Sequence, residues 1–111
     1  MERGRRLDRA LDHHRPSIPE ASRGWVHELT HGVVRLRGRL DHLLDLHLKE
    51  GIGSVPGEVR ILLEMGAYQL LEMGSVPGYA AVSETVDAVR EAGGKGLAGM
   101  TNGVLRSLAR Q

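Results

Sequence analysis

The chain has 111 residues, enough for one domain with its own hydrophobic core but too few for a catalytic domain and a second module. It contains no cysteine, no apolar run that could span a bilayer and no secretory leader, which excludes disulfides and thiolate metal sites and predicts a cytoplasmic protein without membrane contact. The formal net charge is +1, but residues 1–39 carry nine arginines against five acidic residues, whereas residues 40–111 carry six basic and nine acidic residues.

The first half of the chain predicts helices separated by a proline-containing break. Residues 3–14 place apolar side chains on one side of a short helix. Two prolines follow, together with Ser17 and Glu20 at capping-box spacing, which indicates a break and a new helix start. The apolar residues then keep helical period to Leu48. Because so long a pattern in a small domain indicates a bend, we expect Gly38 to divide it into two helices, followed by a loop over residues 49–57.

Three further amphipathic helices are expected in the second half. They cover about residues 58–73, 79–92 and 97–110 and are joined by the short connectors Gly-Ser-Val-Pro-Gly and Gly-Gly-Lys-Gly. Gly74, with Pro77 soon after it, stands where a helix C-cap is expected. Apolar stripes joined by such short links must pack against one another. The sequence therefore predicts an all-α fold: one compact bundle of about six helices over residues 1–111, with a core of aliphatic residues and methionine.

The segment from His27 to His31 matches the H-E-x-x-H pattern of zinc proteases, in which two histidines one helical turn apart hold zinc. The apolar stripe of this helix centres on the opposite side, so both histidines are expected to face solvent. The extended pattern also fails, because Val34 and Arg37 stand where its glycine and third histidine would be. We therefore predict no metal site, and the sequence gives no grounds for a catalytic residue or a cofactor.

The segment Gly93-Gly94-Lys95-Gly96 can be compared with a phosphate-binding loop. It lacks the spacing and the Lys-Ser/Thr ending of such loops and follows a helix rather than a strand, so a helix cap and tight turn account for it. Lys95 nevertheless stands near a helix N-terminus, where backbone amides favour a phosphate.

Several segments, in order and with matching spacing, resemble the NusB domain family. They are Arg60-Ile-Leu-Leu-Glu-Met-Gly-Ala-Tyr-Gln-Leu-Leu71, Val76-Pro-Gly-Tyr-Ala-Ala-Val-Ser-Glu-Thr-Val86, Gly93-Gly-Lys-Gly96 and Thr101-Asn-Gly-Val-Leu-Arg106. Residues 28–41, particularly Arg37-Gly-Arg-Leu-Asp41, look more like the version that forms the N-terminal part of the ribosomal RNA cytosine-5 methyltransferase RsmB. The resemblance implies an all-helical, non-catalytic RNA-binding domain that acts in transcription antitermination or in ribosomal RNA handling.

The chain departs from the family pattern in three places. The family domain usually opens with an arginine-rich helix that contributes to RNA binding, and Met1–Arg6 leaves little of it, so we expect this helix to be missing or shortened. Ser83 replaces the usual asparagine, and Met100-Thr101 replaces Phe-Val. The methyltransferase domain, with its cofactor site and nucleophilic cysteine, is absent from this sequence, so transferase activity is not implied.

Arginine outnumbers lysine 13 to 2, and its planar donor fork suits phosphates and stacked bases, although a GC-rich coding sequence produces the same bias. With the family resemblance, this bias favours ribosomal or leader RNA as the partner. Two alternatives stay open: a protein-interaction module that pairs with a second copy or with a small-subunit ribosomal protein, and an orphaned N-terminal RNA-binding domain of a methyltransferase encoded elsewhere. The predicted RNA-contacting residues are Arg5, Arg6, Arg9, Arg35, Arg39, Lys95 and Arg106.

Overall fold

The computed structural model describes residues 23–110 of the chain. The elements in this range are α2 (Arg23–His47), η3 (Ile52–Ser54, a 3-10 turn), α3 (Gly57–Glu72), α4 (Gly78–Gly93) and α5 (Lys95–Ala109). No strand occurs in this part of the chain, which confirms the predicted all-α class. The expected helix at 3–14, the capping box of Ser17 and Glu20 and the shortened opening helix all fall outside the described residues.

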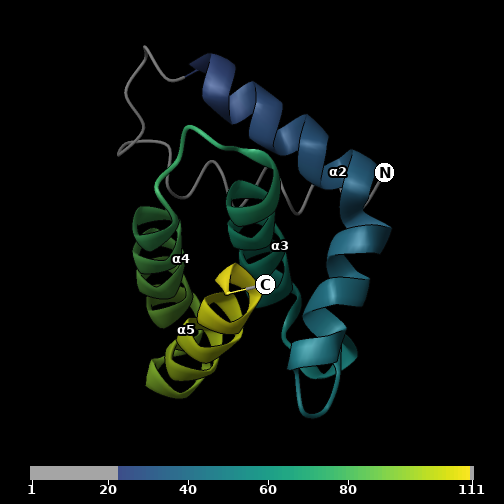
Figure 1. Ribbon diagram of the computed structural model, residues 1–111. Helices are drawn as coiled ribbons and strands as arrows, with labels where there is room; N and C mark the ends of the chain where they lie inside the picture. The colour runs from purple at the N-terminus through teal and green to yellow at the C-terminus, as the bar shows by residue number, and fades with distance from the viewer. Residues whose placement is uncertain (1–22, 111) are drawn as a thin grey trace.

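Helix α2 is continuous over 25 residues, so the prediction that Gly38 divides it into two helices is wrong. Gly38 is exposed, and a Cβ atom added there would meet nothing within 4 Å, so no neighbouring group forces a break at this position. The expected bend is present as a change of direction within the one helix (Figure 1). Backbone hydrogen bonding thus continues through the bend, which is how a long helix follows the surface of a core.

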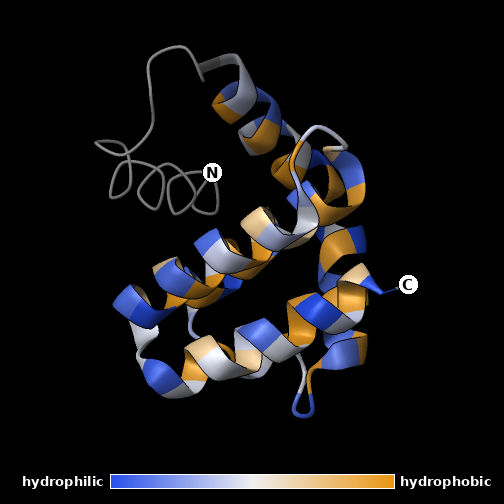
Figure 2. Ribbon diagram, turned by 60° about the vertical axis from the view of Figure 1, so that its left-hand side comes forward, coloured by the Kyte–Doolittle hydropathy of each residue, from blue (hydrophilic) through white to orange (hydrophobic). Residues whose placement is uncertain are grey.

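Helix α3 lies in the middle of the bundle, with α2 on one side and the α4–α5 pair on the other (Figure 1). Nine of its 16 residues are buried, as expected for a helix that neighbours cover on several sides. Figure 2 shows the apolar residues of the helices turned toward one another and the polar residues turned outward. The largest fully buried apolar side chains are Leu29, Leu40, Leu44, Leu63, Leu105 and Leu108, so the predicted aliphatic core is confirmed.

Two glycines allow helices to approach closely. A Cβ atom at Gly66 of α3 would lie 2.7 Å from Oγ1 of Thr85 on α4 and 3.1 Å from a methyl carbon of Leu105 on α5. A Cβ atom at Gly32 of α2 would overlap the ring of Tyr68 on α3. The absence of a side chain at these two positions therefore sets how tightly α3 packs against the other three helices.

The connectors agree with the sequence predictions in part. Gly94 alone separates α4 from α5 and has a φ of 91°, which confirms the predicted cap and tight turn. Helix α3 instead has Met73 as its C-cap, one residue before the expected glycine, and Gly74 has no positive φ. The side chain of Met73 is buried in the core at the point where the helix stops.

The predicted loop between α2 and α3 contains the short turn η3. Gly51 enters this turn with a φ of 82°, and the backbone N–H of Ile52 donates to Oδ1 of Asp45 at 2.8 Å. Ile52 and Val55 are both buried, so this connector contributes to the core rather than extending into solvent. None of the helices in residues 23–110 combines the length and the apolarity needed to cross a membrane.

Candidate nucleic-acid interface

One side of α2 carries a strip of exposed histidine and arginine side chains. His27, His31, Arg35 and Arg39 follow one another at intervals of four residues, which places each beside the next on the helix surface, and all four are exposed. The rings of His27 and His31 lie 3.9 Å apart, and Nδ1 of His31 is 2.9 Å from the carbonyl oxygen of His27. The prediction that both histidines face solvent is confirmed. No group of three metal-binding side chains exists between residues 23 and 110.

Two arginines of this strip, Arg35 and Arg39, match the sequence prediction. Both side chains are exposed, and no carboxylate in the described part of the chain pairs with either. Their guanidinium groups are therefore available to an anion from solvent. Because they stand four residues apart on one helix, they can contact phosphates along a single direction.

Arg37, between these two residues, has the opposite environment. Its Nε atom lies 3.3 Å from Oε1 of Glu64 on α3, and both side chains are buried. Arg60 on α3 continues the network, with Nη2 placed 2.6 Å from Oδ2 of Asp41 and Nε placed 3.6 Å from Oε2 of Glu64. Two residues four apart on α2 thus face two residues four apart on α3. The pattern Arg37-Gly-Arg-Leu-Asp41 therefore supplies one outward arginine and a packed ionic contact between helices.

The electrostatics of this buried cluster are dominated by Glu64. Burial raises the pKa of its carboxyl group from 4.5 to about 8, and the hydrogen bond and the charge of Asp41 act in the same direction. Arg37 and Arg60 oppose this rise because they favour the ionised form. The hydrogen bond to Asp41 is also the main cause of a raised pKa at Arg60. Since Glu64 is 1% exposed between α2 and α3, the cluster connects two helices and is closed to a ligand.

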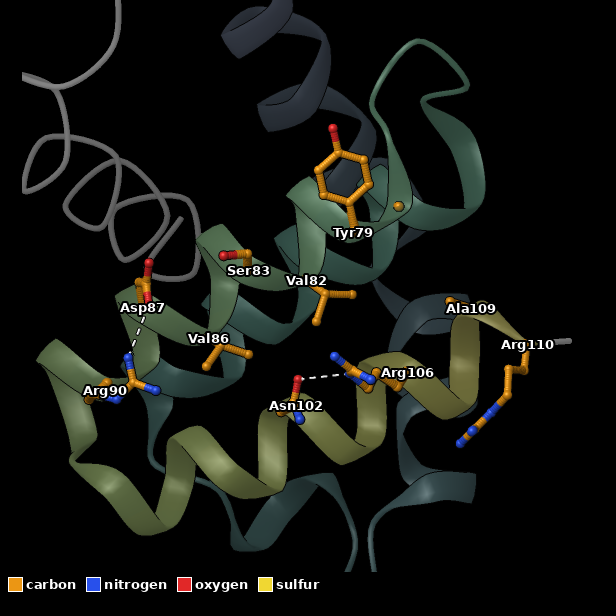
Figure 3. Close-up of a pocket in the computed structure, with 11 residues that line it drawn as sticks. Tyr79, Val82, Ser83, Val86, Asp87, Arg90, Asn102, Arg106, Ala109 and Arg110 are labelled. Atoms are coloured by element: carbon orange, nitrogen blue, oxygen red, sulfur yellow. Dashed lines mark hydrogen bonds and ion pairs between the residues drawn. The ribbon is translucent and has the colours of Figure 1, made fainter.

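An open groove of about 620 Å³ lies between α4 and α5 (Figure 3). Each helix supplies one row of side chains at intervals of three or four residues, and the reversal at Gly94 makes the two rows antiparallel. Val82, Val86 and Ala109 are the apolar side chains of the lining. The polar lining consists of Tyr79, Ser83, Asp87 and Arg90 from α4 and of Asn102, Arg106 and Arg110 from the other side.

The groove has an excess of positive charge. Its one acidic residue, Asp87, is paired with Arg90 through an exposed contact of 3.0 Å. Arg106 donates from Nε to Oδ1 of Asn102 at 3.2 Å and extends from α5 toward α4 (Figure 3). Arg110 donates from Nη2 to Oγ of Ser107 at 3.3 Å. Neither Arg106 nor Arg110 has a carboxylate partner within residues 23–110, so the groove suits an anionic ligand.

The predicted RNA-contacting residues do not form one site. Arg106 lies in the groove, whereas Arg35 and Arg39 lie on α2. Lys95 is exposed at the first residue of α5, about 16 Å along the helix axis from Arg106 at 1.5 Å per residue. Arg5, Arg6 and Arg9 lie outside the residues that the structure describes.

Sequence reasoning missed most of the groove. Tyr79, Arg90, Asn102 and Arg110 were not among the predicted contacts, although the spacing of residues 102, 106 and 110 places three polar side chains on one side of α5. That spacing was a usable signal. The spacing of residues along each helix does not show which side of α4 packs beside this row of α5.

Comparison with known proteins adds a family to this geometry. The NusB family matches residues 1–110. A probable ribosomal RNA small subunit methyltransferase B from Synechocystis is 39% identical over 104 residues, 94% of this chain and 23% of the relative. The methyltransferase B of Thermus thermophilus is 42% identical over 103 residues, 93% of this chain and 24% of the relative. That of Escherichia coli is 31% identical over 111 residues, the whole chain and 26% of the relative.

The chain therefore spans about a quarter of the length of the curated relatives it matches. No solved structure matches the chain at a significant level.

Proposed function

This chain belongs to the NusB family, and from this premise we propose that it is a non-catalytic RNA-binding domain that handles ribosomal RNA in the cytoplasm. The relatives from Synechocystis and Thermus thermophilus are described as methyltransferases of small-subunit ribosomal RNA, which supports ribosomal RNA as the ligand class. Because the chain corresponds to about a quarter of those relatives, we propose that it acts as their RNA-binding portion does, separately from methyl transfer.

The observation that carries this proposal is the division of the arginines into two groups. Arg37 and Arg60 are held against carboxyl groups between α2 and α3. Arg35, Arg39 and Arg106 instead present guanidinium groups to solvent without a carboxylate partner in the described part of the chain. Phosphate contacts from such side chains supply most of the sequence-independent affinity for nucleic acid. The surface therefore suits a phosphate backbone, while the fold is stabilised by other arginines.

A non-catalytic role is supported by the position of Glu64, whose carboxyl group has a strongly shifted pKa. A general acid or base needs access to a substrate in addition to a tuned pKa. Glu64 has a pKa raised to about 8, but it is 1% exposed and lies between two packed helices. Its environment is that of an internal hydrogen-bonding partner. We accordingly assign methyl transfer to none of the residues in this chain.

The test is a binding titration across a salt series. Labelled ribosomal RNA hairpins and a leader RNA would be titrated with the full chain, and fluorescence anisotropy would report the dissociation constant. Phosphate-led binding predicts that the logarithm of the association constant falls linearly with the logarithm of the salt concentration. Undetectable binding to all these RNAs at low salt would overturn the proposal. Tighter binding of the ribosomal hairpin than of the leader would support ribosomal RNA over an antitermination role.

A second candidate function is protein interaction, either with a second copy of the chain or with a small-subunit ribosomal protein. It is favoured by two apolar side chains on the surface of α2, since Val34 is 45% exposed and Leu46 is 66% exposed. Sedimentation velocity over a range of concentrations tests the self-association. A monomer at every concentration would remove the second copy from consideration.

A further inference from the structure

We propose that the groove between α4 and α5 binds a short run of single-stranded RNA, with a base stacked on Tyr79 and a phosphate held by Arg106. This inference rests on the proposed RNA-binding function and names the place and the form of the ligand. The groove is about 620 Å³, within the range of sites that enclose small organic ligands. Tyr79 and Arg90 stand 11 residues apart on α4, or about 16 Å at 1.5 Å per residue. The row of side chains that α4 supplies to the groove is therefore longer than a single phosphate group.

Tyr79 supplies the surface for a base. It lines one end of the groove from the first turn of α4 and is 81% exposed, and its ring extends outward from that helix (Figure 3). The other tyrosine of the chain, Tyr68, is 4% exposed and packs in the core. A large aromatic ring gains little from exposure to water, whereas a nucleotide base stacks on such a ring whatever its identity. Tyr79 is therefore placed as a platform for an unstacked base.

Arg106 supplies the contact to phosphate. Its Nε atom is already used by the hydrogen bond to Asn102, which is half-buried and restricts where the guanidinium group can point. The two terminal nitrogens remain as donors, and a guanidinium group binds phosphate oxygens with such paired donors. Arg110, one turn further along, adds positive charge at the same end of the groove as Tyr79. Because the hydrogen bond to Asn102 orients the Arg106 side chain before binding, less side-chain entropy is lost when a phosphate binds.

The lining favours a single strand over a duplex or a protein partner. A base that stacks on Tyr79 must be free of its neighbours, and bases in a duplex are not. Three apolar side chains, those of Val82, Val86 and Ala109, also line the groove beside the polar rows. The lining has three arginines and one aspartate, and this positive charge complements the negative charge of a nucleic-acid backbone better than that of an average protein surface.

The experiment compares matched variants of the full chain. A labelled single-stranded RNA of about ten nucleotides, within the site sizes of known single-strand binders, and the same RNA as a duplex would be titrated by anisotropy. Tyr79→Ala removes the platform and Tyr79→Phe keeps it. Arg106→Ala removes the phosphate contact, and Lys49→Ala removes an exposed charge that does not line the groove. Circular dichroism would verify that every variant is folded.

We expect the single strand to bind more tightly than the duplex. Tyr79→Ala should weaken binding of the single strand by about 5- to 150-fold, the effect of losing one stacked base. Arg106→Ala should also weaken it, whereas Tyr79→Phe and Lys49→Ala should bind as the parent does. Photo-cross-linking of a thiouridine-substituted strand should map to α4 and α5.

The failures are distinguishable. If the parent binds RNA but the Tyr79 and Arg106 variants bind equally well, the groove proposal is overturned and the RNA-binding function stands. If the parent binds neither RNA form at low salt, both fail. Self-association that is lost in Arg106→Ala would assign the groove to a second copy of the chain and would also overturn the proposal.

Discussion

Arg37 on α2 and Glu64 on α3 form a buried contact of 3.3 Å between Nε and Oε1, two residues away from an arginine that faces solvent. The contact joins the long helix to the central one. The same short segment of α2 therefore provides Arg37 for the interior and Arg39 for the surface. Replacing each of these arginines should affect different properties of the protein.

The first prediction concerns this pair of arginines. Arg37→Ala should lower the free energy of unfolding by about 3 kcal/mol, the lower end of the effect of breaking a buried ion pair, because Glu64 can remain protonated. Arg39→Ala should change it by less than about 0.5 kcal/mol, as expected for an exposed side chain. Urea denaturation followed by circular dichroism measures both values. Equal losses in the two variants would contradict the assignment of Arg37 to the fold.

The second prediction follows from the raised pKa of Glu64. The folded protein holds a proton on Glu64 up to a pH of about 8, whereas the unfolded chain releases it near 4.5. The folded state thus binds more protons in this window, so the free energy of unfolding falls as the pH rises, by at most about 1.4 kcal/mol per pH unit. Glu64→Gln, which stays neutral, should remove this dependence. Urea denaturation at several pH values between 5 and 8 measures it.

The comparison of parent and variant reports on Glu64 together with Asp41, to which it is hydrogen-bonded, since every other titrating group is common to the two proteins. Parallel stability curves across this pH range would show that Glu64 is ionised in the folded state. In that case the arginines would dominate over burial in setting its pKa.

The third prediction uses two glycines of α2. Gly32→Ala should destabilise the protein by about 1–3 kcal/mol, because the new methyl group overlaps the ring of Tyr68 and the core is close-packed. Gly38→Ala should instead stabilise it by up to about 1 kcal/mol through helix propensity, because nothing lies within 4 Å of that position. Thermal and urea denaturation compare them. A stabilising Gly32→Ala would mean that α2 and α3 are further apart than the structure indicates.

The fourth prediction concerns the core. Leu63→Ala in α3 should reduce the free energy of unfolding by about 2–5 kcal/mol, because the side chain is fully buried and its removal leaves a cavity. Leu46→Ala in α2 should reduce it by less than about 0.5 kcal/mol, because Leu46 is 66% exposed. The two midpoints in urea provide the measurement. A large loss from Leu46→Ala would indicate a partner surface on α2, which concentration dependence of the midpoint would confirm.

The fifth prediction concerns RNA binding by α2. Replacing both Arg35 and Arg39 with alanine should reduce the steepness of the salt dependence by about 0.7 to 0.9 for each phosphate contact that is lost. Affinity should decline for every RNA sequence to a similar extent, because phosphate contacts carry no sequence information. Anisotropy titrations across a salt series provide the slope. An unchanged slope would exclude these two arginines from the interface.

Much of the fold could be predicted from the sequence because helical periodicity is a local property. The three C-terminal helices, the aliphatic core and the turn at Gly94 follow from spacing and from glycine. The continuity of α2 through Gly38 could not be predicted in this way. A glycine weakens a helix without breaking it when the residues on either side are packed well enough to keep the helix formed. Met73, rather than the adjacent glycine, is the C-cap of α3.

The site was less accessible to sequence reasoning. The sequence does not show whether an arginine is buried against a carboxyl group or exposed to solvent. Only the packing of α2 on α3 distinguishes Arg37, which contacts Glu64, from the exposed Arg39. The groove depends on which side of α4 meets which side of α5. Asn102 and Arg106 share a row through local spacing, but their position beside Tyr79 depends on how the two helices are paired.

The single residue between α4 and α5 restricts how these two helices can pack beside each other. With only Gly94 between the helices, the placement of α5 relative to α4 is restricted by the backbone geometry of one glycine with a positive φ. A longer turn would remove this restriction on how the row of Arg106 is placed beside the row of Tyr79, while every residue of the groove remained in the chain. The length of this turn, and not only the identity of the lining residues, is thus part of what specifies the surface.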